Sequence, residues 1–348
     1  MKTHFKTAAA LVFTLTACVF VFKNSTDLAE GISQGLTLCA SSVVPSLFPF
    51  MVLSDFIVKS GVSKVLGGIT LKPVGKLLKL SDNGCTVFLM SLVGGYPIGP
   101  KMISELLKEN RICKAEAKRL NLFCINPSPA FVITMLGEVF FGSKALGIIF
   151  YVSCVASSLI IAVFSAFSGE NFHAEKSKIY RIENPVDALV GSAYSGTVSM
   201  LLICAWVVIF NAVISVILYY FKSKTAFYFC SVLEITNGIN LVKKILPFWL
   251  SAFLIAFGGV SVHCQVLSSI RKSEMKTLSF IASRLVHASL TGAVCFVLLK
   301  IFNINANVFS NYASPTANTY SVSLPAAAAL IAMCVLLIFE VDTNRKMC

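Results

Sequence analysis

Two glycine pairs mark positions where backbone groups of this chain could bind a solute. Gly94-Gly95 lies in the stretch 91–109 of the first half, and Gly258-Gly259 lies in the stretch 255–274 of the second half. Each pair ends an apolar run and precedes a short amphipathic stretch that contains Lys or Arg. Glycine leaves the backbone accessible, and a helix that resumes after a break offers unpaired amides and a positive dipole to a polar or anionic solute.

A second interruption is predicted in each half. The apolar runs that open with Arg119-Leu120 and Arg284-Leu285 are interrupted at 126–129, which reads Asn-Pro-Ser-Pro, and at Thr291-Gly292. Proline removes an amide and clashes with the preceding turn. In lipid, freed backbone groups are tolerated only where protein or a water-filled cavity satisfies them. We therefore align the two glycine pairs as equivalent positions of an internal repeat, whose paired interruptions indicate a transporter site rather than simple kinks.

The interruptions define the predicted solute pathway. Its residues are Gly94, Gly95, Tyr96, Pro97, Gly99, Lys101, Asn126, Pro127, Ser128, Gly258, Gly259, Ser261, His263 and Gln265. Tyr96, Lys101 and Asn126 are the first choices for direct contact with the solute. The Lys101 ammonium would suit a carboxylate or would mark the membrane edge, and His263 would relay protons or pack with a hydrogen bond.

Acidic residues beside apolar runs are the candidates for coupling to an ion or a proton. Asp55 lies within an apolar run, where an ionisable group usually faces a cavity or a partner; alternatively it sits near the interface, close to Lys59. Glu234 with Asn237 precedes an apolar segment and would hold a proton or sodium ion, or would cap a helix. These alternatives remain open at the level of sequence.

The composition places the chain in a membrane. Of its 348 residues, 56% are hydrophobic and 13% are charged, about half the charged fraction of a soluble domain. The length allows roughly seven to nine crossings or part-crossings of about 20 residues each. The net charge of +13 sits in short basic clusters between apolar runs, which indicates topology signals and not a nucleic-acid surface.

Enzyme, metal and cofactor motifs are not found in the sequence. The twelve cysteines contain no Cys-x-x-Cys pair, and most lie in apolar runs, which argues against a metal site and a disulfide framework. There is no phosphate-binding glycine loop and no nucleophile elbow. We expect no catalytic residues, no metal and no cofactor.

The order of apolar and polar stretches predicts five regions. Residues 1–24 form a transmembrane helix or signal anchor, with a cleaved signal peptide and a lipoprotein signal as alternatives. Residues 25–168 form the first repeat, 169–190 a polar linker, and 191–302 the second repeat; 303–348 hold an uncharged loop and a last span, 323–339. Two stretches are expected not to span: 27–42 would lie along the interface, and 66–80 would be interfacial or re-entrant.

Three motifs of the first half, and one stretch of the second half, carry a family resemblance. The stretches SLFPFMVLSDF at 46–56, GGYPIGPKMISEL at 94–106 and INPSPAFV at 125–132 resemble the YlbJ-type sporulation integral membrane proteins, as does EITNG at 234–238. That family belongs to the nucleoside-recognition, or Gate, group. The resemblance covers roughly residues 30–300. It implies an all-α polytopic membrane protein with about eight transmembrane or re-entrant helices, arranged in two Gate-type repeats with broken helices.

The resemblance also implies a role. It suggests a sporulation permease for a small polar or anionic, dipicolinate-like solute, located in the cell membrane or outer forespore membrane of a spore-forming bacterium. A nucleoside or nucleobase permease and a non-transporting scaffold of the spore envelope are the alternatives. The expected partners are the lipid bilayer and a small-molecule solute but no nucleic acid; a homo-oligomer or a spore-envelope partner is left open.

The orientation of two basic segments is unresolved by sequence. Related Gate folds use inverted repeats, which would place 101–119 and 271–276 on opposite sides of the membrane if these segments are equivalent. The positive-inside rule would instead place both segments in the cytoplasm, because both are basic.

Overall fold

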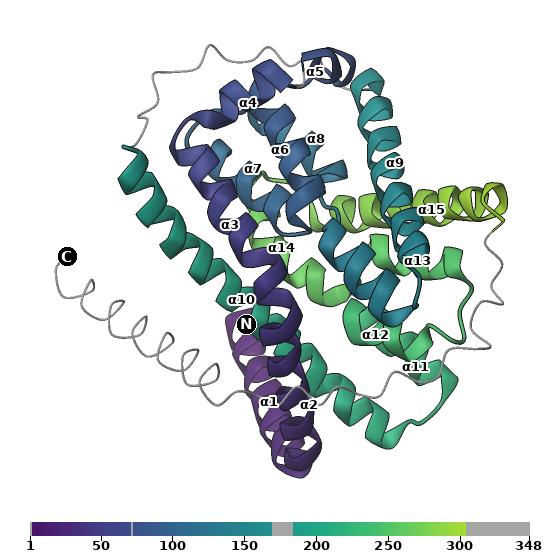
Figure 1. Ribbon diagram of the computed structural model, residues 1–348. Helices are drawn as coiled ribbons and strands as arrows, with labels where there is room; N and C mark the ends of the chain where they lie inside the picture. Colours follow the sequence, from purple (N-terminus) through teal and green to yellow (C-terminus); the bar gives the residue numbers. More distant parts are fainter. Residues whose placement is uncertain (1, 71, 169–183, 304–348) are drawn as a thin grey trace. The chain divides into compact units, whose positions relative to one another are not determined.

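The computed structural model describes residues 2–70, 72–168 and 184–303, which all belong to one compact unit, Met1–Ala306. Its regular elements are helices, and no strand occurs among these residues (Figure 1). Most of the predicted linker and the predicted last span, 323–339, lie outside the described residues. The linker was expected to extend to residue 190, but helix α10 already begins at Pro185, because the Asn184 side chain accepts a hydrogen bond from the Val186 amide and caps it.

The first half contains the following helices in chain order. They are α1 Lys2–Lys23, α2 Ser25–Leu38, the π-helix η1 Cys39–Val43, α3 Val44–Lys59, α4 Val62–Thr70, α5 Lys72–Leu78, α6 Asp82–Gly94, α7 Ile98–Lys108, α8 Lys114–Phe123, the π-helix η2 Ala130–Phe140 and α9 Lys144–Ser168. The second half contains α10 Pro185–Tyr220, α11 Lys224–Leu233, α12 Ile235–Val242, α13 Phe248–Phe257, α14 Gly259–Lys272 and α15 Thr277–Ile301.

Five helical segments of the described chain are long and apolar enough to cross a membrane. They are Ser25–Lys59, Lys144–Phe167, Pro185–Tyr220, Phe248–Leu267 and Thr277–Ile301. Ala10–Lys23 and Ala130–Phe140 are shorter apolar helices. The stretch 27–42 was expected to lie along the interface, but α2 and η1 join α3 in one uninterrupted span candidate. The chain is therefore an all-α polytopic membrane protein.

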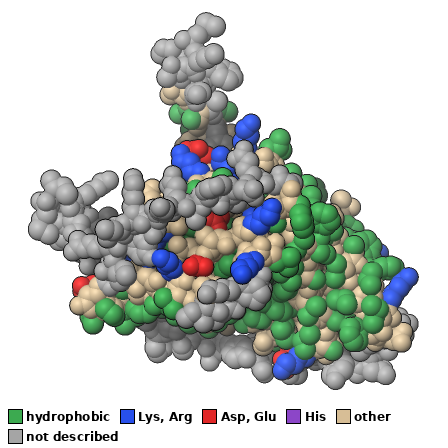
Figure 2. All heavy atoms as spheres, turned by 90° about the horizontal axis from the view of Figure 1, so that it is seen from above, with side chains coloured by type: hydrophobic (Ala, Val, Ile, Leu, Met, Phe, Trp, Pro, Cys, Tyr) green, Lys and Arg blue, Asp and Glu red, His purple; other side chains and the backbone are tan. Residues whose placement is uncertain are grey.

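The distribution of side chains supports this conclusion. Large hydrophobic side chains are exposed along α9, α10 and α15, as for Phe164, Leu202 and Val297, whereas Asn126, Ser158 and other polar residues are fully buried. Figure 2 shows hydrophobic side chains gathered over one side of the visible face and charged side chains elsewhere on it. Large apolar side chains on the exterior, together with polar side chains buried among the helices, suit lipid as the solvent.

One end of the helix bundle, named here the Lys59 end, collects several helix termini. Lys59 at the end of α3 lies against Gly191 near the start of α10, and Arg111, after α7, donates to the Val58 carbonyl. The opposite end is named the Lys243 end. There, Lys243 at the end of α12 lies 5.2 Å from the centre of the Phe140 ring of η2. The direction of each helix is defined by the end of the bundle at which it starts.

Three segments of the first half cross between these ends. The joined helix α2–α3 runs antiparallel to α10, because Gly35 lies against Val208 and Gly196 lies against Val52. Helices α8 and η2 form a broken crossing that starts at the Lys59 end. Helix α9 returns beside it, with Gly147 against Gly137 near the Lys243 end.

Helices α6 and α7 do not cross; they form a re-entrant hairpin that opens at the Lys59 end. A hydrogen bond joins the start of α6 to the segment that follows α7: the Asn83 side-chain amide donates to the Arg111 carbonyl at 3.2 Å. The tip of the hairpin is therefore the segment 95–97, between the end of α6 and the start of α7. Arms of this length reach only part of the way through a bilayer of about 30 Å.

Helices α11 and α12 form a second hairpin, which opens at the Lys243 end. A Cβ atom at Gly238 in α12 would lie 2.3 Å from the Cα atom of Ser231 in α11, so the two helices fold back on each other. The turn between them is Glu234, whose backbone is extended. The second half therefore repeats the hairpin of the first half, but from the opposite end of the bundle.

Helices α13 and α14 form a broken crossing that runs antiparallel to α15. Trp249 at the start of α13 lies against Gly292, and Arg284, nearer the start of α15, donates to the Ala256 carbonyl near the end of α13. The two halves thus contain the same order of crossing, hairpin, broken crossing and crossing, with opposite directions.

This order corrects the repeat alignment made from the sequence. The hairpin tip at Gly95 corresponds to the tip at Glu234, and the interruption at 124–129 corresponds to the one at Gly258. The two glycine pairs are therefore not equivalent. The sequence marks where a helix stops, but whether the chain then turns back or continues depends on contacts between helices that are distant in sequence.

Candidate functional site

The predicted interruption at Gly94-Gly95 is confirmed. Helix α6 ends at Gly94, and Gly95 has φ +95°, a conformation that glycine adopts without steric cost. Helix α7 begins at Ile98 after Pro97, which gives its first amides no side-chain cap. Close packing fixes Gly99 in the first turn of α7, because a Cβ atom there would lie 1.8 Å from the Cys124 carbonyl oxygen.

The predicted interruption at Gly258-Gly259 is also confirmed. Helix α13 ends at Phe257, and α14 begins at Gly259. Gly258 has φ +85° and Gly259 has φ +74°, so two successive residues adopt the left-handed region. No side chain caps the start of α14.

The interruption predicted at 126–129 is confirmed, and the one predicted at Thr291-Gly292 is wrong. Between α8 and η2 the segment 124–129 is not helical, whereas α15 continues without a break from Thr277 to Ile301. The Thr291 hydroxyl donates to the His287 carbonyl four residues earlier, at 2.8 Å. No proline removes an amide there, so glycine alone does not stop the helix.

The four interruptions of the two hairpins and two broken crossings meet at one place. Hairpin tip and broken crossing touch in the first half, since a Cβ atom at Gly95 would lie 3.4 Å from Cβ of Ser128. They touch in the second half, since a Cβ atom at Gly259 would lie 3.3 Å from the Ile235 amide nitrogen. The Tyr96 hydroxyl joins the halves by donating to the Ile255 carbonyl at 2.5 Å. We call this meeting point the central site.

A buried chain of hydrogen bonds runs from the central site into α9 and α15. Arg284 donates from Nη2 to the Ala256 carbonyl at 2.6 Å and to His287 Nδ1 at 2.5 Å. A guanidinium can only donate, so His287 carries its proton on Nε2 and donates towards Ser158 Oγ at 3.1 Å. The Ser158 hydroxyl then donates to Asn126 Oδ1 at 2.5 Å.

These hydrogen bonds orient Asn126, one of the residues predicted to contact the solute. Its amide nitrogen donates to the Phe123 carbonyl at the end of α8 at 2.9 Å, and its carbonyl oxygen accepts from Ser158. Asn126 therefore holds the interruption of the first broken crossing in place. Tyr96 and Ser128 are buried beside it.

Lys101 and Asp55 form an ion pair between α7 and α3. The Lys101 Nζ atom lies 2.8 Å from Asp55 Oδ2, and the two side chains are 12% and 3% exposed. Ser195 of α10 donates its hydroxyl to the same carboxylate oxygen. The Lys101 ammonium is thus neutralised by Asp55 and is not a free cation for a carboxylate solute.

Glu234 caps the start of α12. Its two carboxylate oxygens accept from the backbone amides of Thr236 and Asn237 at 3.0 and 2.8 Å, and its side chain is buried. The structure therefore contains the capping geometry that the sequence allowed, at a hairpin tip in the central site. The Asn237 side chain donates to Asn211 of α10.

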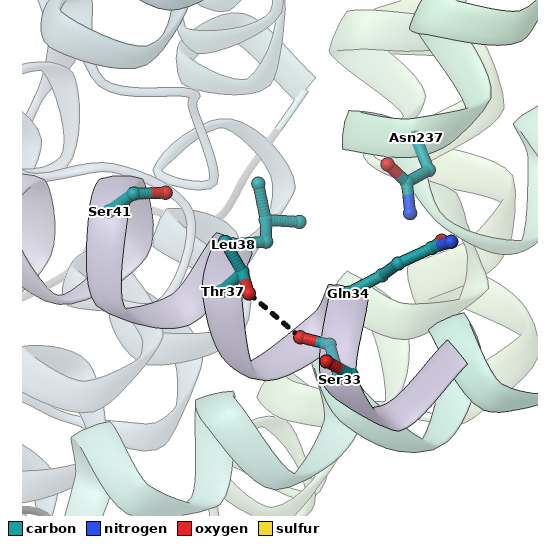
Figure 3. A pocket seen from close by; sticks show the side chains of 6 residues that line it. All are labelled: Ser33, Gln34, Thr37, Leu38, Ser41 and Asn237. Carbon is teal, nitrogen blue, oxygen red and sulfur yellow. Dashed lines mark hydrogen bonds between the residues drawn. The ribbon is translucent and has the colours of Figure 1, made fainter. Parts of the chain in front are cut away.

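An open surface cavity of about 370 Å³, whose lining side chains are mostly exposed, lies beside Asn237. Its lining side chains are Ser33, Gln34, Thr37, Leu38, Ser41 and Asn237 (Figure 3). Gln34 extends from α2 towards Asn237 in this view. The lining carries neutral hydrogen-bonding groups and no charge.

His263 packs at the start of α14. Its Nδ1 atom donates to the Gly259 carbonyl at 2.6 Å, and its ring lies between Phe257 and Phe280, with ring centres 4.6 and 5.1 Å away. Gln265 donates to Ser261 one turn earlier, at 3.3 Å. His263 therefore has the hydrogen-bonded packing geometry that was the alternative to a proton relay.

Several polar residues at these sites were not singled out from the sequence. They are Arg284, His287, Ser158, Ser195, Asn211 and Gln34. Arg284 served only as a marker for the repeat alignment. For Arg284 and His287 the available signal was an ionisable residue inside an apolar run, the same signal that singled out Asp55.

Comparison with known proteins identifies one relative. The chain is 25% identical to the sporulation integral membrane protein YlbJ of Bacillus subtilis (strain 168), over 82% of each chain. No protein-family model matches the chain, and no solved structure matches it. The similarity supports the YlbJ-type assignment indicated by the three motifs, and with the apolar helices it supports a multi-pass integral membrane protein.

Proposed function

We propose that this chain is a sporulation membrane permease that moves a small polar or anionic, dipicolinate-like solute. The relative is described as a sporulation integral membrane protein, which supplies the biological setting. The observation that carries the proposed activity is the central site, where the tips of two oppositely directed hairpins meet two broken crossings. Interrupted helices that meet inside a bilayer provide backbone groups for a solute.

The proposed mechanism is alternating access around the central site. The hairpins α6–α7 and α11–α12 open at opposite ends of the bundle, so each can act as a gate towards one side. Tyr96, Asn126 and Glu234 are buried, so the arrangement is closed to solvent at the centre. Movement of one hairpin at a time would admit the solute from one side and release it to the other.

Reconstitution tests this proposal directly. The purified protein in liposomes is expected to carry pyridine-2,6-dicarboxylate faster than protein-free liposomes, with a rate that saturates as the solute concentration rises. In a spore-forming host, deletion of the gene should give heat-sensitive spores that are poor in this dicarboxylate. Spores with normal dicarboxylate content, together with liposomes as impermeable as the empty ones, would leave the scaffold role instead.

A nucleoside or nucleobase permease is the second candidate. The cavity beside Asn237 favours it, because its lining presents hydroxyl and amide groups that would pair with a neutral base or ribose. Competition of the dicarboxylate flux by uridine or adenine distinguishes the two functions. A nucleoside permease would show uptake of the nucleoside and no effect of the dicarboxylate on it.

A further inference from the structure

Arg284 is a buried cation that forms no ion pair with another described residue. Its side chain is 1% exposed, and it lies within the candidate span Thr277–Ile301. The ion pairs among the described residues are Lys101–Asp55, Arg111–Glu109 and Lys114–Glu274, so none of them includes Arg284. A charge in this position is costly unless a partner neutralises it.

One half of the guanidinium has no hydrogen-bond partner. Nη2 is saturated by the Ala256 carbonyl and His287 Nδ1, whereas Nη1 is buried and makes no hydrogen bond. The two hydrogen bonds of Nη2 fix the position of the guanidinium. The N–H groups of Nη1 are therefore available to a further acceptor. Glu234, the buried carboxylate of the central site, already accepts from two amides of α12.

Two helix N-termini lie beside this guanidinium. Helix α14 begins at Gly259, shortly after the Ala256 carbonyl that Arg284 holds, and α7 begins next to Tyr96, which contacts Ile255 and Gly258. Neither start has a side-chain cap. The positive dipole ends of both helices lie in the same region as Arg284. Helix α14 contributes the amides of its uncapped first turn. Helix α7 contributes the Gly99 amide, because Pro97 and Pro100 have no N–H and the Ile98 amide donates to the Gly95 carbonyl at 3.1 Å.

We propose that Arg284 and the uncapped starts of α7 and α14 form a carboxylate-binding subsite that selects an anionic solute. This inference rests on the proposed permease function and names the group that recognises the solute. A guanidinium binds a carboxylate through N–H donors in a fixed plane. The assignment replaces Lys101, whose charge Asp55 already neutralises.

The alternative is that Arg284 only fastens α13 to α15. Arg119 has such a role, since it donates to the Lys79 carbonyl at 3.0 Å and to Ser165 Oγ at 3.1 Å. A fastening role would change the amount of folded protein but not the choice between solutes. The ratio of two solute fluxes in one preparation separates the roles, because it does not depend on the folded amount.

The test compares pyridine-2,6-dicarboxylate with its uncharged analogue pyridine-2,6-dicarboxamide in liposomes. We expect the wild type to prefer the dicarboxylate, and Arg284→Gln to reduce this preference about tenfold to a hundredfold, the value of a charge-assisted hydrogen bond. Arg284→Lys keeps the charge and should keep part of the preference. The exposed Lys114→Gln removes the same charge outside the subsite and should leave the ratio unchanged.

The outcomes separate the inference from the function on which it rests. If the wild type prefers the dicarboxylate and both Arg284 variants keep that preference, the subsite is wrong and the permease function stands. If the wild type carries the dicarboxamide at least as fast as the dicarboxylate, the protein does not select an anion and the inference is overturned. This outcome does not require that an Arg284 variant folds. If the wild type carries neither probe, the proposed function fails together with the inference.

Discussion

The Lys101 ammonium lies 2.8 Å from the Asp55 carboxylate, in a contact between α7 of the first hairpin and α3. Ser195 of α10 completes this contact from the second half of the chain. Three helices are therefore held by one charge pair that water barely reaches. The sequence singled out Asp55 as an ionisable group in an apolar run and Lys101 as a cation that follows the first interruption; in the structure each is the partner of the other.

A double-mutant cycle should show strong coupling between these two residues. Lys101→Met alone leaves a buried carboxylate unpaired, and we expect it to lower the free energy of unfolding by about 3–5 kcal/mol. The double variant with Asp55→Asn should recover much of that loss. Titration from mild detergent into SDS measures the unfolding. Additive effects would show that the pair contributes no coupling.

The Lys114–Glu274 pair is the matched control for this cycle. Its side chains are 61% and 57% exposed, and the hydrogen bond from Lys114 lowers the pKa of the Glu274 carboxyl. Because both groups remain in water, their coupling should be much weaker than that of Lys101 and Asp55. A coupling as large as that of Lys101 and Asp55 would contradict this account of burial.

Two glycine-to-alanine variants should behave differently. At Gly99 the new Cβ atom would lie 1.8 Å from the Cys124 carbonyl oxygen, so the backbone must move. We expect Gly99→Ala to lower the free energy of unfolding by about 3 kcal/mol. At Gly292, inside α15, the nearest atom is the Trp249 carbonyl oxygen at 3.2 Å.

Gly292→Ala is expected to change stability by less than about 1 kcal/mol, because alanine favours the helix and the contact is only slightly tight. The same SDS titration compares the two variants. Equal decreases in the free energy of unfolding would contradict the close contact between Gly99 of α7 and the Cys124 carbonyl after α8. A large decrease for Gly292→Ala alone would favour the helix break predicted there from the sequence.

Variants of Glu234 separate a helix cap from an ion ligand. As a cap, its carboxylate oxygens accept from the amides of Thr236 and Asn237. Glu234→Ala should then cost about 1–2 kcal/mol of stability, and Glu234→Gln, which retains one acceptor oxygen, should cost less. Any dependence of the wild-type solute flux on sodium or proton gradients should be kept in Glu234→Gln. A flux that no longer responds to either gradient would establish ion coupling at this residue.

Cysteine accessibility should place the two basic segments on the same side of the membrane. Lys114, at the start of α8, pairs with Glu274, and Asn121 donates to Ser273 at 3.0 Å. In a cysteine-depleted background, Lys108→Cys and Lys272→Cys are expected to react with an impermeant thiol reagent from one side. Lys224→Cys at the opening of the second hairpin should react only from the other side.

The sequence predicted most of the interruptions but not their relationship. Backbone freedom at Gly95 and Gly258 and the lost amides at Pro127 and Pro129 are local properties, and the helices stop at these places. The pairing of Gly95 with Glu234 depends on how α11 and α12 fold back, which no local pattern encodes. Likewise, the Lys101 ammonium looked available because Asp55 is distant in the sequence.

The corrected alignment also resolves the conflict over orientation. An inverted repeat would place 101–119 and 271–276 on opposite sides of the membrane only if these two segments were equivalent positions of the repeat. The first segment contains most of α7, the second arm of a hairpin, and the start of α8, whereas the second segment ends a broken crossing. They share the Lys59 end, while the halves that contain them run in opposite directions.

The inverted order of the two halves has a consequence for how such a chain can arise. Apart from α1, and within the described residues, each half crosses three times: α2–α3, α8–η2 and α9 in the first, and α10, α13–α14 and α15 in the second. Because the number of crossings in the first half is odd, the second half begins on the opposite side of the membrane. A tandem copy of one coding segment would thus be inserted upside down without any further signal. Gaining or losing a single pass would place both hairpin gates on the same side and abolish alternation.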